Sequence, residues 1–236
     1  MTDKRKSFDW ILLAIIALAA VLRIFRIASE SLWFDESAVL VRIESSYWGL
    51  FTDWHSHRQG WLHPFLLKLW FGVFGSSETA LRLPSSIFGV LCVWAIYVTG
   101  KKMFGRTAGL AAALFMAVSP FAIQHSQEAR PYTLYLLGGI LSIYSLVLLL
   151  ERYSRGRAAF YVISTLVALF SHPLAILLFP AHVAGYFVFR QYPEYPAIRQ
   201  NTRLLIRTLL LTVILSLPQT GRSLILFVLK ARGGDI

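Results

Sequence analysis

The chain has 236 residues, of which 56% are hydrophobic and only 15% charged, and its formal net charge at pH 7 is +11. Soluble domains typically carry about 25% charged residues, so the composition excludes an ordinary soluble protein and indicates a polytopic membrane protein. The excess of lysine and arginine has two interpretations, a nucleic-acid-binding face or a membrane-topology signal, and its distribution along the chain decides between them.

Seven apolar segments follow one another along the chain and predict transmembrane helices. They cover residues 10–27, 83–99, 108–123, 132–150, 160–170, 174–189 and 204–217. A further apolar stretch at residues 63–75 is short and contains Lys68, so we expect a juxtamembrane helix at the outer interface there. The predicted fold class is all-α, a transmembrane helical bundle of about seven spans that forms a single domain over residues 1–236.

Lysine and arginine concentrate in alternate loops. The N-terminus and residues 101–106, 152–157 and 190–207 are basic. Outer loop 1 (residues 28–80), outer loop 2 (residues 119–131) and residues 171–173 instead carry acidic side chains and histidines. By the positive-inside rule the basic loops and the N-terminus are cytoplasmic. This alternation favours topology over nucleic-acid binding and predicts a multi-pass protein of the plasma (inner) membrane.

Acidic residues and histidines gather on the predicted outer side. The outer histidines are five of six, namely His55, His57, His63, His125 and His172. The outer acids are seven of 12, namely Glu30, Asp35, Glu36, Glu44, Asp53, Glu78 and Glu128. A structural protein has no reason to collect titratable groups against one leaflet, so this pattern predicts an enzyme or transporter with an exoplasmic site.

The first motif is Leu-Trp-Phe-Asp-Glu-Ser at residues 32–37, directly after the first span. Its two aromatic residues are interfacial anchors that hold the carboxylates of Asp35 and Glu36 at the membrane surface. Adjacent carboxylates oppose each other's ionisation, and partial burial raises one pKa, as a general base requires. The structural alternative is that Asp35 caps a helix over residues 36–43, with Glu36 in its first turn.

The second motif occupies residues 119–132, between two spans, with a proline near each end. Arg130 beside a helix N-terminus offers a fork of donors for phosphate oxygens and predicts an anion site. The alternatives are an ion pair between Glu128 and Arg130, or an arginine that reaches toward lipid headgroups.

His63 and His172 each precede a proline at the start of an outer helix. Each is a candidate to donate a hydrogen bond to a phosphate or to cap its helix. The pair His55 and His57 lacks zinc-site spacing, and no third ligand of matching type is near.

Four motifs in this order carry a resemblance to a known family. They are Trp-Phe-Asp-Glu at residues 33–36, His-Pro-Phe-Leu-Leu at 63–67, Glu-Thr-Ala-Leu-Arg-Leu-Pro-Ser at 78–85 and Ser-Gln-Glu-Ala-Arg-Pro-Tyr at 126–132. Over roughly residues 8–190 the chain resembles the C-type (GT-C) membrane glycosyltransferases related to protein O-mannosyltransferases and lipid A aminoarabinose transferases. Where Phe65 stands, the family usually has a second proline.

The resemblance implies an inverting transfer of a sugar from a polyprenyl-phosphate donor to a lipid, glycan or protein acceptor at the exoplasmic face. Asp35 is then the base on the acceptor hydroxyl, with Glu36 assisting or positioning. Arg130 would hold the lipid phosphate, and we assign Glu128, His63 and His172 to the same donor site. No organic cofactor is implied, and a divalent cation is left open. Family members usually continue into further spans and a C-terminal domain, so we expect that the sequence lacks the C-terminal part.

Two other function classes remain as alternatives. A polyprenyl-lipid transporter or flippase would use the same outer anion site but needs charges within the spans. Apart from His182 the predicted spans are nearly free of titratable groups, which argues against it. The other alternative is a non-catalytic membrane subunit that binds the lipid or a partner enzyme.

Overall fold

The computed structural model describes residues 9–52, 60–75 and 77–231, and every regular element in that part of the chain is a helix. In chain order the elements are α1 (Trp10–Ile24), α2 (Phe34–Glu44), α3 (Tyr47–Thr52), α4 (Leu62–Phe74), α5 (Glu78–Phe104), α6 (Arg106–Val118), α7 (Pro120–Ser126), α8 (Tyr132–Glu151), α9 (Arg155–Ser171), the 3-10 helix η1 (Pro173–Leu177), α10 (Leu178–Phe189), α11 (Ala197–Gln200) and α12 (Thr202–Ala231). The predicted all-α fold class is therefore confirmed for these residues.

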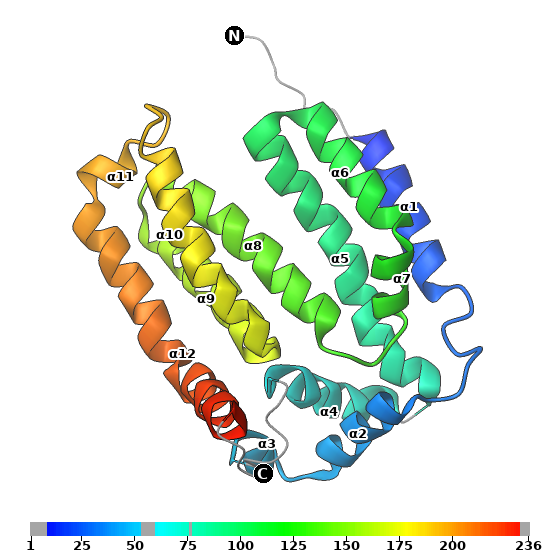
Figure 1. Ribbon diagram of the computed structural model, residues 1–236. Coiled ribbons are helices and arrows are strands. Elements are labelled where there is room, and N and C mark those ends of the chain that lie inside the picture. The colour runs from blue at the N-terminus through cyan, green and yellow to red at the C-terminus, as the bar shows by residue number, and fades with distance from the viewer. Residues whose placement is uncertain (1–8, 53–59, 76, 232–236) are drawn as a thin grey trace.

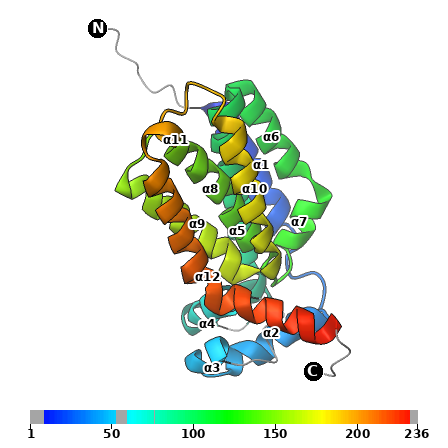
Figure 2. The same cartoon turned by 60° about the vertical axis from the view of Figure 1, so that its left-hand side comes forward.

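The long helices form a bundle, and the short helices α2, α3 and α4 lie across one of its ends (Figure 1, Figure 2). Within the bundle α5 packs against α1, α6 and α8, while α8 packs against α9 and α9 contacts α12. Helix α4 contacts α2, α5 and α9, so it joins the first outer loop to the bundle. A short helix was expected at residues 63–75, and α4 confirms it.

In the part of the chain that the structure describes, three helices are long and apolar enough to cross a membrane, namely α5, α8 and the Thr202–Gly221 part of α12. The pair α6 and α7 makes a fourth if it counts as one span bent by 61°. The other predicted spans correspond to α1, α9 and η1–α10, which are shorter. The structure therefore supports three to four spans by length and composition, and seven spans stays a prediction.

The two kinds of loop lie at opposite ends of the bundle. The turn between α5 and α6, the α8–α9 connection and α11 lie at the end where the chain begins, and these carry the basic residues (Figure 1). The α7–α8 loop and the start of η1 lie at the other end, beside α2–α4 (Figure 1, Figure 2). This separation agrees with the predicted sidedness. Which end faces the cytoplasm remains a prediction from the charge distribution.

A break between α6 and α7 is stabilised by a buried arginine. Pro120 has no backbone N–H, so the carbonyl of Met116 loses its helical donor. Arg23 of α1, which is fully buried, donates to the carbonyls of Met116 at 2.9 Å and Ala117 at 3.0 Å. Its Nε also donates to the Ser126 hydroxyl at 3.2 Å. Arg23 therefore fixes the start of outer loop 2 against α1.

Candidate functional site

Helix α2 presents its two neighbouring carboxylates to different surroundings. Consecutive residues of an α-helix point about 100° apart, and Glu36, seven residues before Ile43, lies almost directly in line with it, whereas Asp35 points away from Ile43. The Glu36 face is buried, and Val39 and Ile43 pack against Leu67 of α4. Burial of such side chains contributes about 2 kcal/mol each. The packing therefore turns Glu36 into the protein and leaves Asp35 64% exposed.

Glu36 forms a buried ion pair with Arg82 of α5. Arg82 Nε donates to Glu36 Oε1 at 2.9 Å, and Arg82 Nη2 donates to Glu36 Oε2 at 2.8 Å. The remaining donors of Arg82 go to backbone carbonyls in the segment after α1, namely Ile27 at 2.9 Å, Glu30 at 2.8 Å and Ser31 at 3.2 Å. All five N–H groups of the guanidinium thus have acceptors, and the arginine ties the first outer loop to the bundle.

The Glu36 carboxylate also accepts two backbone hydrogen bonds. The amide of Trp33 donates at 3.1 Å and the amide of Ala129 in the α7–α8 loop donates at 2.8 Å. Burial alone would raise the pKa of Glu36, but the hydrogen bonds from Arg82, Ala129 and Trp33 together outweigh it and lower that pKa. With its hydrogen-bonding capacity filled, Glu36 is suited to positioning rather than to proton transfer. We name these contacts of Glu36 with Arg82, Trp33 and Ala129 the clamp.

For the motif at residues 32–37, the structural alternative gave Asp35 the capping role, but the structure gives that role to Glu36. Asp35 was considered as the cap of a helix beginning at residue 36, but α2 begins at Phe34 and its cap residue is Trp33. The residue that reaches back to the backbone N–H of Trp33 is Glu36, three positions into the helix. The sequence could not separate the two, because which carboxylate turns inward depends on the packing of α2.

Asp35 is paired with Arg130. Arg130 Nη1 lies 2.9 Å from Asp35 Oδ2, and the Arg130 side chain is only 11% exposed. Arg130 Nη2 also donates to the Tyr132 hydroxyl at 3.0 Å, and its guanidinium lies 5.3 Å from the centre of the Tyr132 ring. The predicted base and the predicted phosphate ligand therefore meet, although they come from different outer loops.

The clamp explains why they meet. Glu36 is the chain neighbour of Asp35, and Ala129 is the chain neighbour of Arg130. The 2.8 Å hydrogen bond from the Ala129 N–H to the Glu36 carboxylate thus ties the α7–α8 loop to α2 next to both candidate side chains. Asp35 is exposed in this pair and Arg130 is nearly buried.

Glu128 has other partners than the one considered from the sequence. Its carboxylate lies 3.1 Å from the Nδ1 of His125 and accepts a hydrogen bond from Gln124 at 3.1 Å. Among the described residues the acidic partner of Arg130 is Asp35, not Glu128. Glu128 therefore organises the α7–α8 loop beside the ion pair.

His63 and His172 both lie close enough to Arg130 to feel its charge. Burial, with the charges of Arg42 and Arg130, lowers the pKa of His63 to about 3, so this side chain is neutral. Within the described residues its Nε2 is buried without a hydrogen-bond partner. Burial and Arg130 also lower the pKa of His172. Its Nδ1 accepts from the Leu174 amide at 3.2 Å, so it caps η1, and a neutral ring then carries its proton on Nε2.

Aromatic rings line the approach to Arg130. The Tyr132 ring lies 4.7 Å from that of His125 and 5.7 Å from that of His172. The His172 ring in turn lies 5.4 Å from that of Tyr135. These rings bring α7, α8 and the start of η1 to one surface beside the cationic group.

Two arginines that support the site were not singled out from the sequence. Arg82 was quoted only within a family motif, and Arg23 only as part of an apolar run. A signal existed for both, because an arginine inside an apolar helix is costly to bury unless acceptors surround it. Their partners are spread over distant segments, so the sequence alone does not identify them.

Three of the acidic and histidine residues predicted on the outer side lie outside the residues that the structure describes. Asp53, His55 and His57 are outside the described part of the chain. Within that part, no group of three or more His, Cys, Asp or Glu side chains is placed to hold a metal ion.

The chain is similar to a known protein family. Residues 58–219 match the model of a protein family described as dolichyl-phosphate-mannose-protein mannosyltransferase. The matched segment contains Arg82, Arg130, His63 and His172, and it begins after Asp35 and Glu36. No curated protein matches the chain.

Proposed function

Because the chain belongs to the dolichyl-phosphate-mannose-protein mannosyltransferase family of membrane glycosyltransferases, we propose that it transfers a sugar from a polyprenyl-phosphate donor to an acceptor hydroxyl at the outer membrane face. Asp35 is the general base and Arg130 binds the donor phosphate. Glu36 and Arg82 are positioning residues.

The observation that carries this proposal is the 2.9 Å contact between Asp35 and Arg130. An inverting transfer needs a base for the incoming hydroxyl and a cation for the departing phosphate, one on each side of the sugar, so the Asp35–Arg130 contact must open when the donor enters. Both groups are present at the end of the bundle that holds α2–α4, and both start from backbone fixed by the clamp. Fixing the backbone of both residues before the substrates bind lowers the barrier.

Two bonds break and two bonds form in the proposed transfer. The acceptor O–H bond breaks and its proton goes to the Asp35 carboxylate, while a new bond forms between the acceptor oxygen and the anomeric carbon. The bond between that carbon and the phosphate oxygen breaks, and the phosphate leaves with the electron pair as polyprenyl phosphate. Arg130 stabilises the negative charge that develops on the leaving oxygen.

Arg130 serves two partners in this scheme. Before the donor binds, its guanidinium is paired with the carboxylate that must act as base. The donor phosphate, a singly charged diester, offers its non-bridging oxygens to the same N–H groups. Donor binding therefore releases Asp35 toward the acceptor, which favours an order in which the donor binds first.

Three further side chains support the donor site. His63 and His172 are neutral, so each can donate a hydrogen bond to a phosphate oxygen without adding charge. Glu128 holds His125 and so shapes the loop that carries Arg130.

The test is sugar transfer by the full chain, purified in detergent, from labelled polyprenyl-phosphate mannose and its glucose and arabinose equivalents. Asp35→Asn should lower the transfer rate about 100-fold or more, because it removes the base. It should leave the unfolding temperature nearly unchanged, because Asp35 is exposed. Glu44→Gln, an exposed carboxylate on the same helix, is the matched control and should keep full activity.

The outcomes separate the function classes. Wild-type rates retained by Asp35→Asn would remove Asp35 from catalysis. Donor binding without transfer to any acceptor or to water would instead favour a non-catalytic, lipid-binding subunit. Movement of the donor across proteoliposomes without transfer would favour a flippase.

A further inference from the structure

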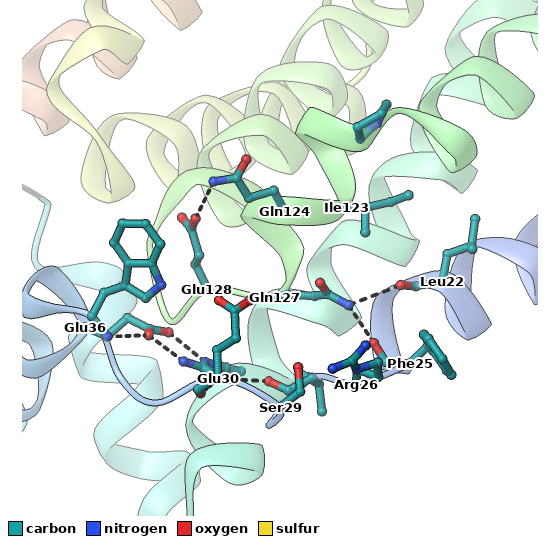
Figure 3. A pocket seen from close by; sticks show the side chains of 14 residues that line it. Leu22, Phe25, Arg26, Ser29, Glu30, Glu36, Ile123, Gln124, Gln127 and Glu128 are labelled. Carbon is teal, nitrogen blue, oxygen red and sulfur yellow. Dashed lines mark hydrogen bonds and ion pairs between the residues drawn. The ribbon is translucent and has the colours of Figure 1, made fainter.

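A pocket of about 630 Å³ opens next to the clamp, between the segment that follows α1 and the α7–α8 region. Figure 3 shows Glu30 entering it from the first segment and Gln124 and Glu128 entering it from the second. Trp33 and the clamp residues Glu36 and Arg82 also line it. Asp35 and Arg130 do not line the pocket, so it is a separate space beside their ion pair.

The lining carries both signs of charge. Outside the clamp it has two carboxylates, Glu30 and Glu128, against one guanidinium, that of Arg26. An acidic balance of this kind disfavours a phosphate, which the ion-pair site already accommodates. Sugar hydroxyls both donate and accept hydrogen bonds, so they match carboxylates, an amide and a guanidinium placed around one space. The indole of Trp33 adds a flat apolar surface for the C–H face of a sugar ring.

Two of the polar groups have unused hydrogen-bonding capacity. Among the described residues, the guanidinium of Arg26 and the carboxylate of Glu30 form no hydrogen bond or ion pair. Both side chains are exposed. Behind them the side-chain amide of Gln127 joins the two segments of the pocket wall by donating to the carbonyls of Leu22 at 3.2 Å and Phe25 at 2.9 Å.

Arg26 is also held in an unfavourable backbone conformation. It has φ +58° and is the one non-glycine residue with positive φ among those described. This left-handed region normally takes glycine or asparagine after a helix end. An arginine kept where glycine would relieve strain is a feature typical of functional positions.

We propose that this pocket binds the acceptor, and that the acceptor is a carbohydrate. The inference rests on the proposed function and specifies its substrate class. Trp33 and Glu36 line the pocket on either side of Asp35 in the chain, and Glu128 lines it two residues before Arg130. Asp35 does not line the pocket, so the reacting hydroxyl belongs to the part of the sugar that extends out of the pocket toward the ion pair. That hydroxyl gives its proton to Asp35 and its oxygen bonds to the anomeric carbon of the donor.

Binding is tested first, without donor. Methyl glycosides of common hexoses and a serine- and threonine-containing peptide are compared on the full chain in detergent by saturation-transfer NMR. We expect saturable binding of at least one methyl glycoside, weakened about tenfold by Glu30→Gln and by Arg26→Gly, as expected for loss of a hydrogen bond to a charged group. Glu44→Gln is the matched control and should bind like the wild type. Arg26→Gly should also raise the unfolding temperature, because glycine adopts positive φ without strain.

Transfer is tested second, with the same glycosides as acceptors. Glu30→Gln and Arg26→Gly should raise the acceptor KM about tenfold and leave the kcat within about twofold, since neither side chain touches the reacting atoms. Preference for the peptide, or an unchanged acceptor KM in both variants, would overturn the carbohydrate pocket while leaving the proposed function in place. Absence of any transfer, together with glycoside binding that depends on Glu30, would overturn the proposed function and leave a carbohydrate-binding pocket.

Discussion

Glu36 and Arg82 face each other inside the protein through two hydrogen bonds of 2.9 and 2.8 Å, with 1% and 4% of their side chains exposed. This pair joins the start of α2 to the start of α5, and its carboxylate extends the connection to Ala129. Arg130 follows Ala129 in the chain and Asp35 precedes Glu36, and these two neighbours form the second ion pair. The geometry of the candidate site thus depends on two charges that are themselves inaccessible.

Glu36→Gln should destabilise the protein and impair transfer together. The amide presents N–H groups to donors that were paired with a carboxylate, so Arg82 keeps an uncompensated buried charge. We expect a loss of about 3 kcal/mol in unfolding free energy, the usual cost of breaking a buried pair. Thermal unfolding in detergent measures it, with Glu44→Gln as the control.

Loss of transfer without loss of stability in Glu36→Gln would contradict the positioning role. A Glu36→Gln protein with wild-type stability that loses transfer as completely as Asp35→Asn would place Glu36 directly in catalysis. A positioning residue predicts instead that stability and activity fall together, and that Asp35→Asn affects activity alone.

Arg130→Ala should weaken donor binding. It removes a charged donor from the phosphate, so the donor KM should rise about tenfold or more while the acceptor KM stays within about twofold. The donor KM of Arg130→Lys should lie between those of the wild type and Arg130→Ala, because lysine keeps the positive charge but lacks the planar fork that reaches Asp35 and Tyr132 together. Arg203→Ala, an exposed arginine at the opposite end of the bundle, is the control. An unchanged donor KM in Arg130→Ala would exclude the phosphate role.

Acidification should destabilise the folded protein through His63. The folded pKa is about 3, against an ordinary value of 6.5. Between these pH values the unfolded chain binds a proton at His63 and the folded chain does not, so stability rises with pH across this window. The contribution approaches about 1.4 kcal/mol per pH unit.

Unfolding temperatures at pH 7.5 and pH 5 measure this effect. The wild type should lose more stability on acidification than His63→Gln, which has no group to titrate. Equal losses in the two proteins would show that His63 is accessible to protons in the folded state.

Arg23→Met should destabilise the break between α6 and α7. It leaves the carbonyls of Met116 and Ala117 buried without donors, at a cost of about 1–3 kcal/mol for an unsatisfied group. Adding Pro120→Ala restores a backbone N–H that can serve Met116, so the double variant should regain part of the loss. Chemical unfolding of the four proteins in the cycle measures the coupling, and strictly additive effects would contradict the capping role.

Much of the architecture could be predicted from the sequence. Long apolar runs that recur along a chain are typical of membrane-spanning helices and not of soluble domains, so the helical bundle follows from composition and periodicity. Charge in alternate loops predicted which segments share an end, and the structure places the acidic and histidine-bearing loops together with α2–α4. Helix lengths were less predictable, because Pro120 divides one apolar run into α6 and α7.

The candidate site residues were partly predictable from the same hydropathy and charge pattern. Asp35 and Arg130 stand out because charged residues at the edge of apolar segments are costly and need a purpose. The sequence also marked Glu36, but it gave no means to distinguish the two adjacent carboxylates. Their difference arises from the face of α2 that packs against Leu67 and Leu81.

By itself, the sequence determined a basic, membrane-embedded helical protein with its titratable groups gathered at one face, because hydropathy and charge act locally along the chain. Only the tertiary structure decided that Asp35 meets Arg130, that Glu36 is locked to Arg82 and that Arg23 caps a broken helix. Each of those contacts joins segments that are distant in sequence. Their partners are selected by packing and by the need to satisfy every buried polar group, and neither condition is defined until the helices are assembled.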